Sequence, residues 1–146
     1  MDYSNIQKSA VIGELRAMQV FVALGFEVYQ QLTGKEAADF VAVKDKKIYR
    51  VEVKTTSVYR NDSWVFNIAR TRHNASKKSK KYKFSEYKKD LDLLVLYIKP
   101  KDCVMIYHKD EISTQTQVRI HNKEMEVRKY DEFLKYEAIN TNIKEK

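Results

Sequence analysis

The sequence has few of the residues that interrupt or crosslink a chain, with three Gly, one Pro and one Cys among 146 residues. So little Gly and Pro excludes collagen-like and low-complexity proteins. The lone Cys103 excludes an internal disulfide and fits a reducing, cytoplasmic setting. No apolar run approaches the roughly 20 residues that span a bilayer, and the start does not resemble a secretory signal. We therefore expect an intracellular protein with no membrane partner.

Acidic residues are also in short supply, because 20 Asp and Glu face 28 Lys and Arg and leave a net charge of +8. Such an excess attracts polyanions. Most of it falls between residues 70 and 83, a stretch without any acid. A charge run of this kind is often a solvated loop, but Lys and Arg also supply sequence-independent contacts to DNA phosphates. The basic residues of this run, which we call the basic segment, are Arg70, Arg72, Lys77, Lys78, Lys80, Lys81 and Lys83.

The composition is that of a folded α/β chain, since 43% of the residues are hydrophobic and the length fits a single domain, 1–146. Residues 5–24 show helical periodicity and end at Gly25, where a left-handed residue is expected. Glu14 falls near the centre of the apolar arc of this helix. Ser85 is expected to cap a short helix through Lys89. Strands are predicted at 26–31, 37–43, 48–54, 64–69, 91–98, 103–107 and 117–121, and a final helix at 131–138.

The polar turn between 37–43 and 48–54 fixes a hairpin register that places two acids face to face. If the turn is centred on Asp45 and Lys46, Asp39 lies opposite Glu52, and Lys54 projects from the same face. Directly opposed like charges destabilise a sheet, so something positive must lie between the carboxylates. Mg²⁺ fits this requirement, because it binds carboxylate oxygens together with water and phosphate; Mn²⁺ is expected to substitute. The pattern predicts a hard-cation site with Lys54 on its substrate side.

Glu14 would supply a third carboxylate from the helix that packs over this sheet, which would explain a charged residue among apolar ones. The alternative is a buried ion pair of Glu14 with Arg50 or Lys54. Asp90 and Asp92 are interpreted as structural residues at the end of a short helix and the entrance of a strand. No His and Cys cluster has zinc-site spacing, and no Gly-rich phosphate loop is present.

These residues together resemble the PD-(D/E)xK nuclease superfamily, in which an Asp is followed on the next strand by Glu-x-Lys. The resemblance covers about residues 8–108, so 1–108 is expected to be the catalytic core and 109–146 an extension. Within the superfamily the chain resembles the small group I intron homing endonucleases and their phage and bacterial relatives. The stretches that carry this likeness are Gly13-Glu14-Leu15, Tyr49-Arg50-Val51-Glu52-Val53-Lys54-Thr55 and Asp90-Leu91-Asp92-Leu93. Ala38 departs from the family pattern, which has Pro at this place.

The resemblance implies a restriction-endonuclease-like α/β fold, with an N-terminal helix on a mixed sheet, and Mg²⁺-dependent hydrolysis of duplex DNA. It implies Asp39 and Glu52 as metal ligands, Glu14 as an auxiliary ligand, and Lys54 beside the attacking water. A Holliday junction resolvase, a restriction-type enzyme and a non-catalytic DNA-binding protein on the same scaffold remain alternatives. One site per chain and two strands to cut predict a homo-oligomer, either a homodimer or the homotetramer that the resemblance to homing endonucleases suggests. Its interface is expected within 109–146, where Phe133, Leu134 and Tyr136 could be exposed.

Overall fold

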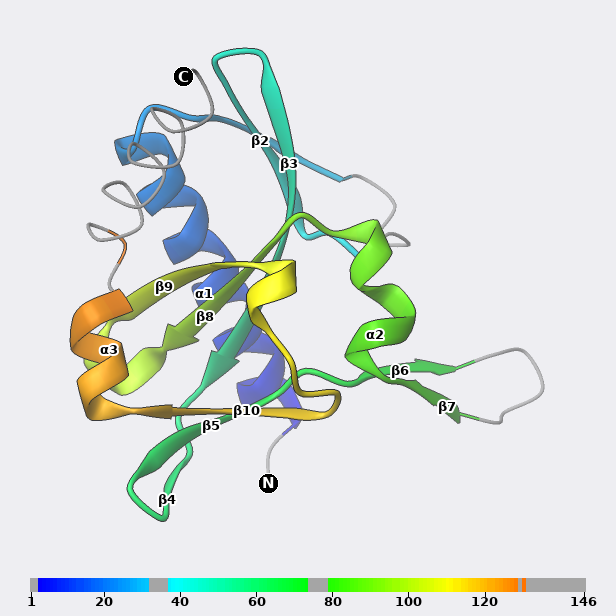
Figure 1. Ribbon diagram of the computed structural model, residues 1–146, viewed down its shortest axis with the longest axis vertical. Coiled ribbons are helices and arrows are strands. Elements are labelled where there is room, and N and C mark those ends of the chain that lie inside the picture. The colour runs from blue at the N-terminus through cyan, green and yellow to red at the C-terminus, as the bar shows by residue number, and fades with distance from the viewer. Residues whose placement is uncertain (1–2, 32–36, 74–78, 129, 131–146) are drawn as a thin grey trace.

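The computed structural model describes residues 3–31, 37–73, 79–128 and 130. A long helix, α1 (Tyr3–Ala23), packs on one face of a five-stranded sheet and lies behind it in Figure 1. The chain leaves α1 through Gly25, whose φ of 93° is the left-handed conformation that ends many helices. The predicted N-terminal helix and its stop are confirmed. None of the described helices is long and apolar enough to cross a membrane.

The five-stranded sheet has the order β1-β2-β3-β8-β9 and is mixed, because β3 and β8 run parallel while the other neighbours are antiparallel. All six residues of β8 are buried, and their uninterrupted apolar run is typical of a strand that is covered on both faces. The strands are β1 (Glu27–Gln30), β2 (Phe40–Lys44), β3 (Lys47–Thr56), β8 (Leu93–Ile98) and β9 (Cys103–His108). The five matching strand predictions are correct in type, although the strand predicted at 37–43 begins only at Phe40.

The sheet face opposite α1 is covered by later segments of the chain, drawn in front of it in Figure 1. A second sheet has the order β10-β5-β4, and its apolar side chains join the core on this side. A separate two-stranded hairpin, β6 with β7, projects from the body. The elements are β4 (Tyr59–Arg60), β5 (Ser63–Asn67), β6 (Arg70–His73), β7 (Ser79–Tyr82), α2 (Phe84–Tyr87), β10 (Gln117–His121) and α3 (Asn122–Arg128), with 3₁₀ turns at Lys88–Asp90, Lys99–Lys101 and Lys109–Glu111.

Three details of the sequence predictions need correction or lie outside the described residues. Ser85 does not cap α2, because the N-cap position is Lys83, which makes no side-chain capping bond. The helix α3 and the β6–β7 hairpin were not predicted. The expected helix at 131–138 falls outside the described residues.

The predicted apolar face of α1 is rotated from the one that is buried. The helix packs on the sheet through Gly13, Ala17, Val20, Phe21 and Leu24. Other apolar side chains of α1 point to solvent instead, and Glu14, expected near the centre of the apolar arc, lies half-buried at the edge of the packed stripe. The exposed large apolar residues of α1 are Ile6, Val11, Ile12, Leu15 and Val22. The periodicity failed here because α1 carries apolar residues on two sides.

Gly13 lets α1 approach β3 closely, and its replacement tests this contact. A Cβ at this position would lie 1.8 Å from Thr55 Oγ1, which no packed structure accommodates. Ala is favoured over Gly in helices by about 1 kcal/mol, so an open position would be stabilised by Gly13→Ala. We expect destabilisation of about 1–3 kcal/mol instead, as for other overpacked sites.

Denaturant midpoints of a double-mutant cycle check this expectation. Thr55→Ala removes the clashing oxygen, so adding it to Gly13→Ala should recover most of the lost stability. A Gly13→Ala variant more stable than the parent would contradict the close approach.

Candidate active site

The candidate site forms where the edge of β3 is left open. β2 pairs only with the first half of β3, from Lys44 opposite Lys47 to Phe40 opposite Val51. Asp39, the residue before β2, continues the pairing with β3 through one backbone and one side-chain hydrogen bond. Its backbone N–H donates to Val51 O at 2.7 Å, and its Oδ2 accepts a hydrogen bond from Val53 N at 2.7 Å. A carboxylate therefore occupies the edge position that a backbone carbonyl would fill in a longer strand.

The predicted hairpin register is confirmed. Its turn residues, Asp45 and Lys46, have φ of 51° and 66°, as a two-residue hairpin turn requires. This register, continued by one residue, sets Asp39 against Glu52. Both belong to the sheet face away from α1, because the alternate residues Phe40 and Val51 belong to the core cluster against α1.

Glu52 and Lys54 form a buried ion pair next to Asp39. Lys54 Nζ lies 2.8 Å from Glu52 Oε1, and the side chains are 23% and 5% exposed. The other carboxylate oxygen, Glu52 Oε2, is buried and has no hydrogen-bond partner in the described part of the chain. An unpaired buried carboxylate oxygen is costly, so this atom is available to a ligand that enters the site.

Glu14 reaches the site from the other side of the sheet. The helix packs over the sheet as expected, but on the face opposite Glu52, so Glu14 does not lie directly over the two opposed acids. The open edge of β3 still brings the Glu14 carboxyl to Asp39. Burial raises the pKa of Glu14, and hydrogen bonding with Asp39 partly offsets this rise.

The alternative ion pairs of Glu14 are not formed. Lys54 pairs with Glu52, and Arg50 pairs with Asp92 at 3.1 Å. Asp92 Oδ2 also accepts a hydrogen bond from Arg50 N at 2.7 Å, which ties the entrance of β8 to β3. The arrangement fits the structural interpretation of Asp92.

Asp39 has the most perturbed carboxyl group of the site. Burial, together with the charges of Glu14 and Glu52, raises its pKa to about 7, against the lowering effects of the Val53 N–H and Lys54. Up to neutral pH part of the folded chains therefore keep a proton on Asp39 that an ordinary Asp would have lost. A group poised in this way becomes fully charged when positive charge enters the site.

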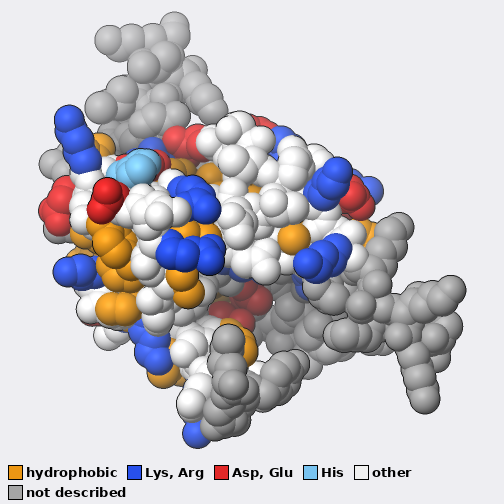
Figure 2. Space-filling view, turned by 90° about the horizontal axis from the view of Figure 1, so that it is seen from below, with side chains coloured by type: hydrophobic (Ala, Val, Ile, Leu, Met, Phe, Trp, Pro, Cys, Tyr) orange, Lys and Arg blue, Asp and Glu red, His pale blue; other side chains and the backbone are white. Residues whose placement is uncertain are grey.

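One cavity of about 570 Å³ lies between α1, β3 and the start of β6. Its lining includes the four predicted site residues, Glu14, Asp39, Glu52 and Lys54. Figure 2, the view from below, shows acidic side chains set back in a hollow, with Lys and Arg spread over the face around it. No group of three or more His, Cys, Asp and Glu side chains in the described chain is already gathered as a metal-binding set. The cavity lining is Asn5, Ile6, Ser9, Ala10, Glu14, Ala37, Asp39, Glu52, Val53, Lys54, Thr55, Thr56, Ser57, Val58 and Arg70.

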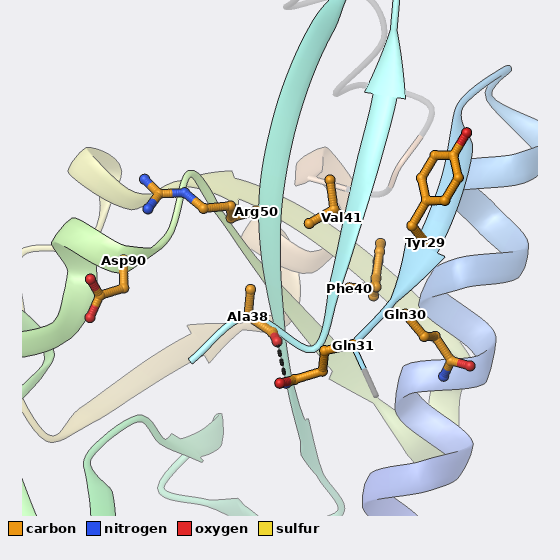
Figure 3. A pocket seen from close by; sticks show the side chains of 8 residues that line it. All are labelled: Tyr29, Gln30, Gln31, Ala38, Phe40, Val41, Arg50 and Asp90. Carbon is orange, nitrogen blue, oxygen red and sulfur yellow. Dashed lines mark hydrogen bonds between the residues drawn. The ribbon is translucent and has the colours of Figure 1, made fainter. Parts of the chain in front are cut away.

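A second cavity, of about 250 Å³, lies beside β1 and β2 (Figure 3). Gln31 Nε2 closes one side by donating to Ala38 O at 2.6 Å. Asp90, which carries the carboxyl group among the described lining residues, points away from β2 in Figure 3. The polar groups do not converge, so this cavity lacks the chemistry of the first. Its lining is Tyr29, Gln30, Gln31, Ala38, Phe40, Val41, Arg50 and Asp90.

The basic segment is divided by the fold. Arg70 begins β6 and lines the larger cavity, whereas Lys81 on β7 and the adjoining Lys83 are exposed. Arg72 and Lys80 belong to the paired strands of the hairpin. Lys77 and Lys78 lie outside the described residues. The sequence offered no signal that separated Arg70 from its neighbours.

Comparison with known proteins agrees with this geometry. The chain is similar to the solved structure of a bacterial homing endonuclease, I-Ssp6803I, with a TM-score of 0.64 and 20% identity over 78% of this chain and 76% of that one. This likeness confirms the restriction-endonuclease-like fold. A search of curated proteins found no match. The family described as PD-(D/E)XK endonuclease matches residues 4–139, nearly the whole chain, and the chain therefore belongs to the PD-(D/E)XK endonuclease family.

Proposed function

We propose that the chain is a metal-dependent, site-specific endonuclease that hydrolyses phosphodiester bonds of duplex DNA, in the manner of a homing endonuclease. The observation that carries the proposal is the convergence of Asp39, Glu52 and Lys54 on one cavity at the open edge of β3. Membership of an endonuclease family and the fold of a bacterial homing endonuclease support it.

A hard divalent cation, Mg²⁺ or Mn²⁺, fits the carboxylates of the site. The buried Glu52 Oε2 lacks a partner, and Asp39 is raised in pKa partly by the charges of Glu14 and Glu52. Positive charge between these groups would relieve both effects. Asp39 and Glu52 would hold the ion, with Glu14 as an auxiliary ligand. When bound, the ion would stabilise charge on the phosphate and lower the pKa of water.

Lys54 is placed to act on the nucleophile. Its ammonium group is fixed by Glu52 Oε1 and is only partly exposed, so it can donate to a water molecule beside the phosphate. The Val53 N–H holds Asp39 in the adjacent position. These contacts would fix the orientation of the reacting groups before DNA arrives, which is how a site lowers the cost of reorganisation.

The exposed part of the basic segment is proposed to contact the DNA backbone. The β6–β7 hairpin projects from the body in Figure 1. Its base lies near the cavity, because Arg70 at the start of β6 belongs to the cavity lining. Lys81 and Lys83 are exposed there. Contacts of this kind to phosphates are independent of sequence and would position the duplex over the site.

The test is cleavage of a library of duplexes by the purified chain in Mg²⁺, with EDTA as the control. We expect cuts at a restricted set of sequences that stop when EDTA removes the ion. Preferred cutting of a four-way junction would favour a resolvase. Binding without cleavage in both Mg²⁺ and Mn²⁺ would favour a non-catalytic scaffold and would contradict the proposal.

We also propose a homo-oligomer, built at least partly through α1. Val11, Leu15 and Val22 follow one another at spacings of four and seven residues and are 51%, 57% and 60% exposed. This spacing suits packing along the same helix of a second copy. A two-fold assembly would present one site to each DNA strand. The interface residues expected from the sequence, Phe133, Leu134 and Tyr136, lie outside the described residues.

Leu15→Lys should therefore convert the oligomer to a 17.3 kDa monomer, because a charge would be buried at the contact. Ile48→Lys is the matched control, since Ile48 is 66% exposed beside the β2–β3 turn and should leave the mass unchanged. Light scattering during gel filtration measures both. A parent protein that is itself monomeric would refute the assembly.

A further inference from the structure

Buried polar atoms without partners point to a function for Arg70. In the described part of the chain, the buried side-chain atoms that lack any hydrogen bond are Glu52 Oε2, Thr55 Oγ1 and Arg70 Nη1. All three residues line the same cavity of about 570 Å³. Leaving such an atom unsatisfied destabilises the folded protein, and more so when the group is charged. Their presence in one cavity marks it as a place that a charged ligand completes.

Two of these atoms already have an explanation. Glu52 Oε2 belongs to the carboxylates proposed for the cation. Thr55 Oγ1 lies on the α1 side of β3, where it faces Gly13. The guanidinium of Arg70 is the group that neither the metal site nor helix packing uses.

Arg70 is held on a rigid platform. Its guanidinium carbon lies 5.6 Å from the ring centroid of Tyr87, in a cation–π contact. The Tyr87 ring is 4% exposed, and its hydroxyl donates to the carbonyl of Ile68. Phe84 packs edge-on against the same ring at 5.4 Å. A guanidinium seated in this way keeps its position without a partner, unlike an exposed lysine of the hairpin.

Arg70 Nη1, which lacks a hydrogen-bond partner among the described residues, does not bind the carboxylate of Glu52. Glu52 Oε1 takes Lys54, while Oε2 and Arg70 Nη1 both stay open although they line the same cavity. The acids of the site need positive charge, but a guanidinium needs an anion. A phosphodiester offers two non-bridging oxygens, which match the fork of N–H donors in arginine.

We infer that Arg70 binds the scissile phosphodiester inside the cavity and so differs in role from the exposed residues of the basic segment, which contact phosphates along the duplex. This inference rests on the proposed function. Phosphoryl transfer spreads negative charge over the non-bridging oxygens, and a fixed donor at that place is stronger than a mobile one. Arg70 therefore acts on the cleavage step, whereas the exposed lysines act on binding.

Cleavage kinetics separate these roles. With protein in excess over DNA, Arg70→Ala should cut about 10²–10³-fold more slowly, as for the loss of one fixed donor in other active sites. Arg70→Lys should recover little of this loss, and guanidinium ion at low concentration should restore part of the rate of Arg70→Ala. Arg119→Ala is the control, because Arg119 is exposed on β10. An unchanged rate at saturation, or a loss that guanidinium does not rescue, would overturn the inference.

A second measurement does not depend on cleavage. Dimethyl phosphate, a phosphodiester monoanion, is titrated in EDTA while NMR follows the arginine Nε–H signals. The Arg70 signal should move and saturate, and the Arg119 signal should stay in place. If the chain cuts no DNA but Arg70 responds, the phosphate site stands and the nuclease proposal fails. If DNA is cut but Arg70 does not respond, the inference fails and the nuclease proposal stands.

Discussion

Replacing Glu52 by Gln is expected to lower DNA cleavage by at least about a hundredfold. Residues that only orient a metal ligand cost 10–100-fold when they are changed, so a ligand itself should cost at least the upper end of that range. Gln keeps the size of Glu52 but removes the charge that faces Lys54 at 2.8 Å and leaves no carboxylate at the buried Oε2 position. The cleavage rate is measured at saturating Mg²⁺, where weaker metal binding is partly compensated.

Binding and folding must be followed alongside the rate. Fluorescence anisotropy in EDTA should show DNA binding that is equal or stronger, because a negative charge next to the phosphate has been removed. Glu86→Gln, on the exposed surface of α2, is the matched control and should cut at the parent rate. Equal cutting by Glu52→Gln and the parent would remove Glu52 from the site.

The hairpin that carries the site could be read from the sequence because its geometry is local. Once Asp45 and Lys46 are placed in a two-residue turn, alternation fixes every later pair, and the observed register agrees. The conformation of the chain before Phe40 is not fixed by the turn or by other residues close in sequence. The strand predicted over 37–43 begins at Phe40, and this late start opens the edge of β3 through which Glu14 reaches Asp39.

The packing of α1 shows a different limit. Ala17 and Phe21 are fully buried, whereas Leu15 and Val22 on the same helix are more than half exposed. Periodicity measures only where apolar side chains gather around a helix, and it cannot say which of two apolar sides meets the sheet. Glu14 lies at the boundary between the buried and the exposed side of α1. Its position relative to the sheet could therefore not be predicted without knowing which side is buried. The contact of Arg70 with the Tyr87 ring could not be predicted either, because the two residues are far apart in the sequence.

The metal-free protein is expected to lose stability as the pH rises from about 4 to above 7, and Asp39 should be the main cause. Its pKa in the folded chain is about 7, against 3.8 for an ordinary Asp. Between these values the folded chain holds a proton that the unfolded chain has released, so raising the pH favours unfolding. Each pH unit of this window is worth at most about 1.4 kcal/mol. The pKa of Glu14 is raised as well, so Glu14 contributes to the stability change with the same sign. The charge of Lys54 lowers the pKa of Asp39 and so limits the effect.

Asp39→Asn tests the assignment, because it removes the charge that repels Glu14 and Glu52 while an amide oxygen can still accept from Val53 N. In EDTA the variant should gain stability over the parent at pH 8 and show no such gain at pH 4, as measured by urea unfolding. Asp45→Asn, in the exposed turn, controls for loss of a carboxylate alone. Mg²⁺ at pH 8 should stabilise the parent more than Asp39→Asn, since the variant lacks one of the two carboxylates proposed to hold the ion. A parent whose stability rises between pH 4 and 8 in EDTA would contradict the raised pKa of Asp39, and with it the crowding of acids from which the cation site is inferred.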